Sequence, residues 1–272
     1  MPREADGSFH SGTAEIESRR EDDPIETSVV YLIDADRCTL NTEKVLPNYL
    51  AAMRKVSDRY QIGDIVSELE YVKEKIESTG GSFDLIGALR GILERKGFSS
   101  VLPEINDEYA SLVRDEDGLL FDGAIEMLQY LDDQQRYKGI ITYGGDEWQT
   151  IKVSNTDLRR WRFTVVDSPR KSDMIAAWKQ PDGRFLIPAG LVAPEPALTW
   201  EVVLVDDKPE AFEGMVDGMR GYLIVRNGAA TFSQRVSDRG GRAVTVIDDL
   251  RTIIVEEQQR SDSETLTYSH AS

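Results

Sequence analysis

Short apolar runs alternate with amphipathic segments along most of this chain. The apolar runs show no polar–apolar alternation, which is typical of strands that are buried on both faces of a parallel sheet. Strands are predicted at 28–33, 138–143, 163–167, 201–207, 221–226 and 243–247. Helical spacing of apolar residues follows most of these runs, and strands that alternate with helices indicate right-handed crossovers. The pattern therefore predicts an α/β core with a mainly parallel sheet.

One long stretch, residues 43–115, departs from this alternation. Apolar residues recur there at helical spacing in four consecutive segments, and no convincing strand interrupts them. Such a block predicts a helical subdomain that is inserted into the α/β core. The predicted division is an acidic, disordered N-terminal tail (1–27), a core (28–42 and 116–258), the helical insertion (43–115) and a polar, disordered C-terminal tail (259–272).

Composition and charge narrow the range of partners. The chain of 272 residues carries 49 acidic and 32 basic residues, and its net charge of −17 argues against general binding to nucleic acid, whose phosphates would repel it. No apolar stretch reaches the roughly 20 residues that cross a membrane, and the N-terminus lacks an apolar signal segment. We therefore expect a soluble cytoplasmic protein without a nucleic-acid or membrane partner, and its oligomeric state stays open.

The rarest residue types exclude several kinds of active site. Cys38 is the one cysteine, so the chain has no internal disulfide and no Cys-rich zinc site. Both histidines, His10 and His270, lie in the predicted tails, which leaves none for a Ser-His-Asp or Cys-His group. No Walker phosphate loop or GxGxxG turn follows a strand. Catalysis must therefore depend on carboxylates, lysine and hydroxyl groups, with or without a hard metal ion.

Chemically active side chains stand where three of the predicted strands end. Asp34 and Asp36 follow the first strand, Thr142 ends the second, and Asp206 and Asp207 end the fourth. Open parallel sheets bind ligands at the carboxyl ends of their strands, so these side chains are expected to share one crevice. Clustered carboxylates repel one another unless a cation lies between them. Without histidine or thiolate ligands, Mg²⁺ is the best-fitting ion.

A second acidic pair, Asp248 and Asp249, also follows an apolar run. It directly precedes an amphipathic helix, and we assign it to helix capping. A helix is also predicted at 209–217, with Pro209 in its first turn. Lys208 lies between the earlier pair and that proline, which leaves a short loop before the helix. The metal chemistry is therefore assigned to the earlier pair.

The order of these motifs resembles that of the haloacid dehalogenase-like hydrolase superfamily over roughly residues 28–255. The first family motif, strand then Asp-x-Asp, matches LIDADRC, and the second, a strand that ends in Thr or Ser, matches GIITYGG. A lysine before a helix, in SPRKSDMIAAW, and strand-Asp-Asp, in VVLVDDKPE, match the third and fourth. The resemblance implies a Rossmann-like three-layer α/β/α core, with 43–115 as a helical cap that closes over the site and helps to select the substrate.

The resemblance also implies a role for each motif residue. Asp34 would be the nucleophile that forms an aspartyl-phosphate, and Asp36 would be the general acid and base. Thr142 and Lys171 would bind the phosphoryl oxygens. The residues that would hold Mg²⁺ are Asp34, Asp36 through its backbone carbonyl, Asp206 and Asp207. An acid two residues after the nucleophile favours phosphatase or phosphotransfer chemistry over dehalogenation.

Two assignments within the motifs need comment. The phosphate-binding lysine is Lys171, which precedes a helix as in the family, or Lys152, which lies ten residues past Thr142. We prefer Lys171 for this role. The family usually has Thr or Val four residues after the nucleophile, where this chain has Cys38, and we interpret that change as structural.

The sequence thus predicts a Mg²⁺-dependent phosphatase that hydrolyses a small phosphorylated metabolite through an aspartyl-phosphate. One alternative is a phosphotransferase or mutase, in which a second hydroxyl group rather than water accepts the phosphoryl group. The other is a non-catalytic binding protein on the same fold. Presence of the motif acids together with Thr142 and Lys171 argues against that last alternative. The substrate itself is not identified.

Overall fold

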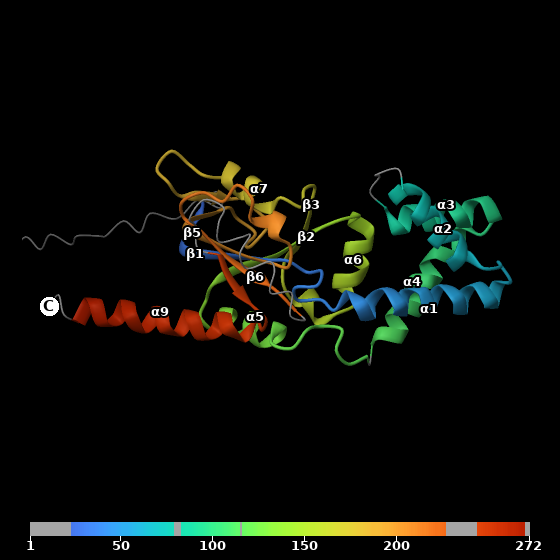
Figure 1. Cartoon of the computed structure of the whole chain (residues 1–272), viewed down its shortest axis with the longest axis horizontal. Coiled ribbons are helices and arrows are strands. Elements are labelled where there is room, and N and C mark those ends of the chain that lie inside the picture. The colour runs from blue at the N-terminus through green and yellow to red at the C-terminus, as the bar shows by residue number, and fades with distance from the viewer. Residues whose placement is uncertain (1–22, 79–82, 115, 227–243, 270–272) are drawn as a thin grey trace, which may run out of the picture.

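The computed structural model describes residues 23–78, 83–114, 116–226 and 244–269 (Figure 1). Its centre is a sheet with the strand order β3-β2-β1-β5-β6-β7, and β4 pairs with β5 outside this path. The strands are β1 (Ile25–Ile33), β2 (Tyr137–Tyr143), β3 (Phe163–Val166), β4 (Phe185–Ile187), β5 (Ala197–Asp206), β6 (Met219–Ile224) and β7 (Val244–Ile247). Every neighbouring pair is parallel except β4 with β5. The prediction of a mainly parallel sheet is confirmed.

Helices cover both faces of this sheet. They are α5 (Ala124–Asp133), α6 (Asp146–Ser154), α7 (Lys171–Ala177) and α9 (Arg251–Ser269). Alternate residues of β1 enter two separate apolar clusters: Tyr31 joins the cluster that contains residues of α5 and α9, and Leu32 joins the one that contains Ile175 of α7. Burial on both faces explains why residues 29–33, the second half of β1, are all apolar. The three-layer α/β/α core is therefore confirmed.

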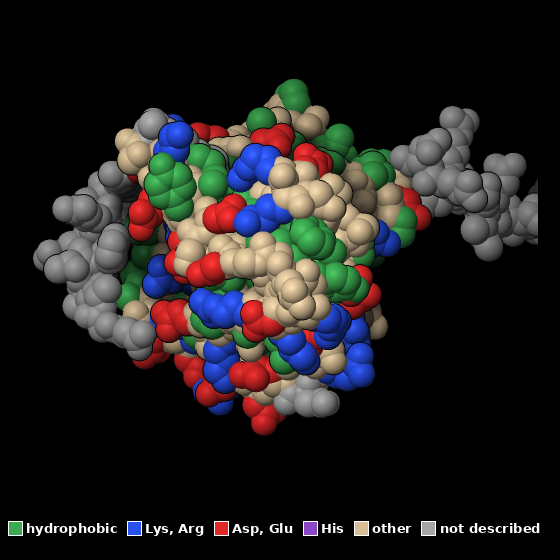
Figure 2. Space-filling view, turned by 90° about the vertical axis from the view of Figure 1, so that its right-hand side faces the viewer, with side chains coloured by type: hydrophobic (Ala, Val, Ile, Leu, Met, Phe, Trp, Pro, Cys, Tyr) green, Lys and Arg blue, Asp and Glu red, His purple; other side chains and the backbone are tan. Residues whose placement is uncertain are grey.

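Within its described residues, the predicted helical insertion forms four α-helices and one 3-10 helix, η1 (Ser99–Val101), and the α-helices lie together beside the sheet in Figure 1. They are α1 (Thr42–Tyr60), α2 (Ile65–Ser78), α3 (Leu85–Lys96) and α4 (Leu102–Val113). Helix α1 packs against α4 and α2, and α2 packs against α3. Acidic and basic side chains are interspersed over the face that Figure 2 shows. One apolar cluster joins residues of these helices to residues of the sheet, and the division into core and cap stays a prediction.

The boundaries of several elements differ from the prediction. Strand β1 begins at Ile25 rather than at 28, because Ile25 pairs with Ala197 of β5. Helix α9 continues to Ser269, although a tail was predicted from 259, and no glycine or proline interrupts it. Residues 1–22 and 270–272 lie outside the described residues, so the tail predictions there stay predictions.

The helix predicted at 209–217 is also shorter than expected. Only a 3-10 turn, η3 (Pro209–Phe212), forms there, because Glu213 is extended and Gly214 has a φ of +87°. The long segment between α7 and β5 contains β4, the antiparallel strand, as an elaboration at the sheet. Among the described residues, no helix combines the length and the apolar character that crossing a membrane requires.

Candidate active site

Parallel pairing brings the ends of β1, β2 and β5 to one edge of the sheet. Ile33 of β1 pairs with Ile140 of β2 on one side and with Val205 of β5 on the other. The next residue, Asp34, continues the ladder, since its backbone N–H donates to the carbonyl of Val205 at 2.8 Å. Asp206 is the last residue of β5. The side chains of Asp34 and Asp206 are therefore adjacent and almost fully buried, with 4% and 1% of each residue exposed.

Three of the four predicted metal-binding residues form a cluster. Asp34, Asp206 and Asp207 each offer a carboxylate oxygen, and these oxygens lie within 4.8 Å of one another. The Oδ1 atom of Asp207 is buried and has no hydrogen-bond partner in the described structure. These buried carboxylates lie close together and have too few hydrogen-bond donors around them to balance their charge. Their oxygens are hard ligands of the kind that Mg²⁺ prefers. The residues present therefore fit the ion.

Lys171 is a buried cation in contact with this cluster. The residue begins α7, and its Nζ donates to Asp34 and, at 2.7 Å, to Oδ2 of Asp206. Its exposed fraction is 2%. Of the two lysines that the sequence offered, this one contacts the predicted nucleophile.

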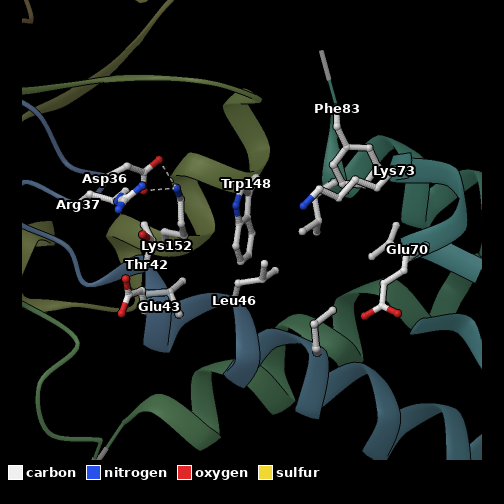
Figure 3. A pocket seen from close by; sticks show the side chains of 14 residues that line it. Asp36, Arg37, Thr42, Glu43, Leu46, Glu70, Lys73, Phe83, Trp148 and Lys152 are labelled. Atoms are coloured by element: carbon white, nitrogen blue, oxygen red, sulfur yellow. Dashed lines mark hydrogen bonds and ion pairs between the residues drawn. The ribbon is translucent and has the colours of Figure 1, made fainter. Parts of the chain in front are cut away.

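Asp36 stands apart from the carboxylate cluster and has its own partners. Its side chain binds two residues of α6. The Nζ of Lys152 lies 2.6 Å from Oδ2 of Asp36 (Figure 3). The Nε2 of Gln149 lies 2.9 Å from the same oxygen. Both partners are buried. The sequence analysis did not identify this contact, although the i, i+3 spacing of the two residues would place them on one face of a helix. Lys152 is thus a partner of the predicted general acid.

Thr142 is the second-last residue of β2, and Cys38 lies between β1 and α1. The Thr142 hydroxyl is buried and has no hydrogen-bond partner among the described residues, which leaves it able to donate to a ligand. Cys38 is fully buried, and burial raises the pKa of its thiol well above the ordinary value. A buried, neutral thiol agrees with the structural interpretation of that residue.

Burial dominates the electrostatics of the cluster. It raises the pKa of Asp34 to about 7, with Lys171 acting against that rise and the charge of Asp206 adding to it. It also raises the pKa of Asp207 to about 6, and the charge of Asp34 contributes. Burial would lower the pKa of Lys171, but the charges of Asp34 and Asp206 raise it above its ordinary value. Negative charge in this crevice is therefore incompletely balanced.

In the metal-free protein, we expect Asp207→Asn to increase the free energy of unfolding at pH 7.5 by roughly 1–2 kcal/mol. The ordinary pKa of this carboxyl is 3.8 and its folded pKa is about 6, so between these values the folded state binds more protons than the unfolded chain. The free energy of unfolding of the wild type therefore decreases as the pH rises from about 4 to about 6, because the folded state must give up a proton that the unfolded chain has already lost. The stability difference between the two proteins should shrink toward pH 4.

Thermal and urea unfolding in EDTA measure this difference. Mg²⁺ at pH 7.5 should stabilise the wild type more than the variant, because the ion favours the charged carboxylates. The assignment of Asp207 to a metal site would be contradicted if the variant were less stable than the wild type in EDTA. It would also be contradicted if Mg²⁺ stabilised the variant as much as the wild type.

Comparison with known proteins agrees with this arrangement at the level of the fold. No family model and no curated protein sequence matches the chain. A solved structure assigned to the haloacid dehalogenase-like hydrolases, from Burkholderia xenovorans LB400, is 18% identical over 85% of this chain and 97% of that one, with a TM-score of 0.51. A 2-haloacid dehalogenase from Pseudomonas syringae pv. Tomato DC3000 is 16% identical over 86% of this chain and 100% of that one, with a TM-score of 0.50. The chain therefore has the fold of the haloacid dehalogenase-like hydrolase superfamily.

Proposed function

We propose that this protein is a Mg²⁺-dependent phosphatase that acts on a small phosphorylated metabolite through an aspartyl-phosphate at Asp34. The observation that carries the proposal is the contact of buried Asp34 with Lys171, beside the carboxylates of Asp206 and Asp207. A carboxylate nucleophile next to cationic groups suits attack on a phosphoryl group, whose oxygens carry negative charge. We further propose that the protein acts in the cytoplasm.

In the first half-reaction, a carboxylate oxygen of Asp34 attacks phosphorus, and the bond from phosphorus to the ester oxygen breaks. Asp36 supplies the proton that the departing alcohol needs. Lys171 and the Thr142 hydroxyl donate to phosphoryl oxygens as the charge on them redistributes. Bound Mg²⁺, held by Asp34, Asp206, Asp207 and the backbone carbonyl of Asp36, would neutralise further charge on these oxygens.

In the second half-reaction, water attacks the phosphorus of the aspartyl-phosphate. Asp36 takes a proton from this water, and the bond from phosphorus to the Asp34 oxygen breaks, which returns both carboxyl groups to their initial states. Lys152 and Gln149 hold the Asp36 side chain beside a cavity that borders the site. In this proposal, α6 therefore orients the general acid and base.

Hydrolysis of p-nitrophenyl phosphate tests the proposal. Turnover should require Mg²⁺ and should stop in EDTA, whereas 2-chloropropionate, offered as a dehalogenase substrate, should release no chloride. Chloride release without phosphate release would identify a dehalogenase instead. Transfer of phosphate to an added alcohol in preference to water would favour a phosphotransferase.

Asp36→Asn should act differently on two kinds of ester. We expect kcat/KM for an alkyl phosphate to fall by about 10²–10⁴-fold, the usual contribution of a general acid, because an alkoxide leaves poorly without a proton. For p-nitrophenyl phosphate the fall should be less than about tenfold, since p-nitrophenolate needs no proton to leave. Equal losses on both substrates would contradict the assignment of Asp36 as the acid.

A further inference from the structure

A cavity of about 500 Å³ borders the site, and Asp36 and Lys152 lie at one end of it. Figure 3 shows the two ends: the Asp36–Lys152 pair lies on one side, and Phe83, Glu70 and Lys73 lie on the other. The cavity runs between residues of α1 and α2 and residues of α6. A group attached to a phosphate at Asp34 would enter it past Asp36.

The middle of this cavity has an apolar wall. Its apolar lining residues in the helices are Val45, Leu46, Leu50, Leu69, Leu85 and Trp148. The Trp148 ring is supported from behind by Tyr49, with the two ring centroids 4.8 Å apart in an edge-to-face contact. Tyr49 is fully buried and does not line the cavity. The indole is therefore a fixed wall rather than a loose side chain.

Polar side chains line the end of the cavity next to the site, where Asp36 accepts hydrogen bonds from Lys152 and Gln149 and where Arg37, Thr42 and Glu43 also lie. The apolar wall in the middle offers no such group, so a ligand hydroxyl beside it would lose its water without gaining a partner there. An apolar group in the same place would gain by leaving water, by about fourfold in affinity for each methylene that becomes buried. The cavity therefore discriminates between the two kinds of group.

We propose that this cavity binds the apolar leaving group of the substrate, so that the substrates are phosphate monoesters of aryl alcohols or of medium-length alkyl alcohols. This inference rests on the proposed phosphatase function. The phosphate lies at Asp34, the ester oxygen lies near Asp36, and the apolar group extends along Trp148 toward Phe83. Sugar phosphates and other polyhydroxylated esters are poor substrates.

A series of substrates tests the inference in the intact protein. From ethyl to hexyl phosphate, kcat/KM should rise about fourfold per methylene until the cavity is filled, and phenyl phosphate should resemble the longer esters. Glucose 6-phosphate and glycerol 3-phosphate should react at least tenfold less efficiently than hexyl phosphate. A preference for the polar esters, with Asp34-dependent turnover of p-nitrophenyl phosphate intact, would overturn the inference and leave the phosphatase proposal standing.

A pair of matched variants tests the position of the apolar group. Leu46→Asn places an amide in the wall and should lower the hexyl-to-ethyl ratio of kcat/KM at least tenfold. Leu112→Asn makes the same change at another partly buried position, on α4 and outside the cavity lining, and should leave that ratio within twofold of the wild type. An unchanged ratio in Leu46→Asn, with the protein folded by circular dichroism, would overturn the inference.

Binding of alkylphosphonates, which cannot be hydrolysed, separates this inference from the proposed function. Affinity measured by calorimetry should rise from methylphosphonate to hexylphosphonate. An affinity that did not rise with the length of the alkyl chain would overturn the proposal that the cavity binds apolar groups. A rising series in a protein that turns over no phosphate ester would support the ligand class and overturn the phosphatase proposal.

Discussion

Asp34→Asn is expected to reduce kcat/KM for p-nitrophenyl phosphate by at least roughly a thousandfold, which corresponds to about 4 kcal/mol of transition-state stabilisation. The amide that replaces the carboxylate cannot attack phosphorus, so the proposed covalent intermediate cannot form. The variant should still fold, because Lys171 keeps its contact with Asp206 at 2.7 Å and a neutral amide replaces a carboxyl whose pKa burial has raised to about 7. Steady-state kinetics with Mg²⁺ and circular dichroism measure the two outcomes.

Asp248→Asn is the matched control for this variant. It makes the same change in the acidic pair that follows β7, on an exposed side chain outside the carboxylate cluster. Its activity should stay within twofold of the wild type. An Asp34→Asn protein that kept a tenth or more of the wild-type activity would show that Asp34 is not the nucleophile.

Lys171→Met should have the largest effect on stability. The lysine side chain is buried between Asp34 and Asp206, so its loss leaves two buried carboxyl groups without their cation. Breaking such a pair typically costs about 3–5 kcal/mol in the free energy of unfolding. Activity should fall at least about a hundredfold, because a donor to the phosphoryl oxygens is lost. Urea unfolding at pH 7.5 and steady-state kinetics measure these effects.

Lys138→Met provides the comparison for a lysine outside the site. Lys138 is also buried, but its partner Asp132 is a largely exposed side chain that water can solvate when the lysine is removed. That variant should therefore lose much less stability, and its activity should not change. If the two variants lost equal amounts of stability, the explanation that Lys171 neutralises two buried carboxyl groups would be contradicted.

The convergence of Asp34 with Asp206 could be predicted because it follows from local pattern and topology alone. Asp34 and Asp206 each end an apolar run, and parallel strands place such ends at the same edge of a sheet. The preference for Lys171 over Lys152 came instead from the resemblance to the family, which places this lysine before a helix, and Lys171 does begin α7.

Contacts that depend on packing could not be predicted in this way. The bond from Lys152 to Asp36 joins residues 116 positions apart, and it depends on which face α6 turns toward the sheet edge. The 3-10 turn at Pro209 depends on the φ of Gly214, which the apolar spacing does not reveal. Likewise, the early start of β1 depends on its pairing with β5, a partner that is distant in sequence.

The covalent intermediate at Asp34 is the central claim, and chemical trapping tests it most directly. Protein that is turning over p-nitrophenyl phosphate in Mg²⁺ is quenched in acid and treated with borohydride, which reduces an acyl phosphate to the alcohol and so converts aspartate to homoserine. The peptide is then sequenced by mass spectrometry. We predict homoserine at position 34 only when substrate and Mg²⁺ are both present. Full turnover with unmodified Asp34, or homoserine at another carboxylate, would contradict the mechanism.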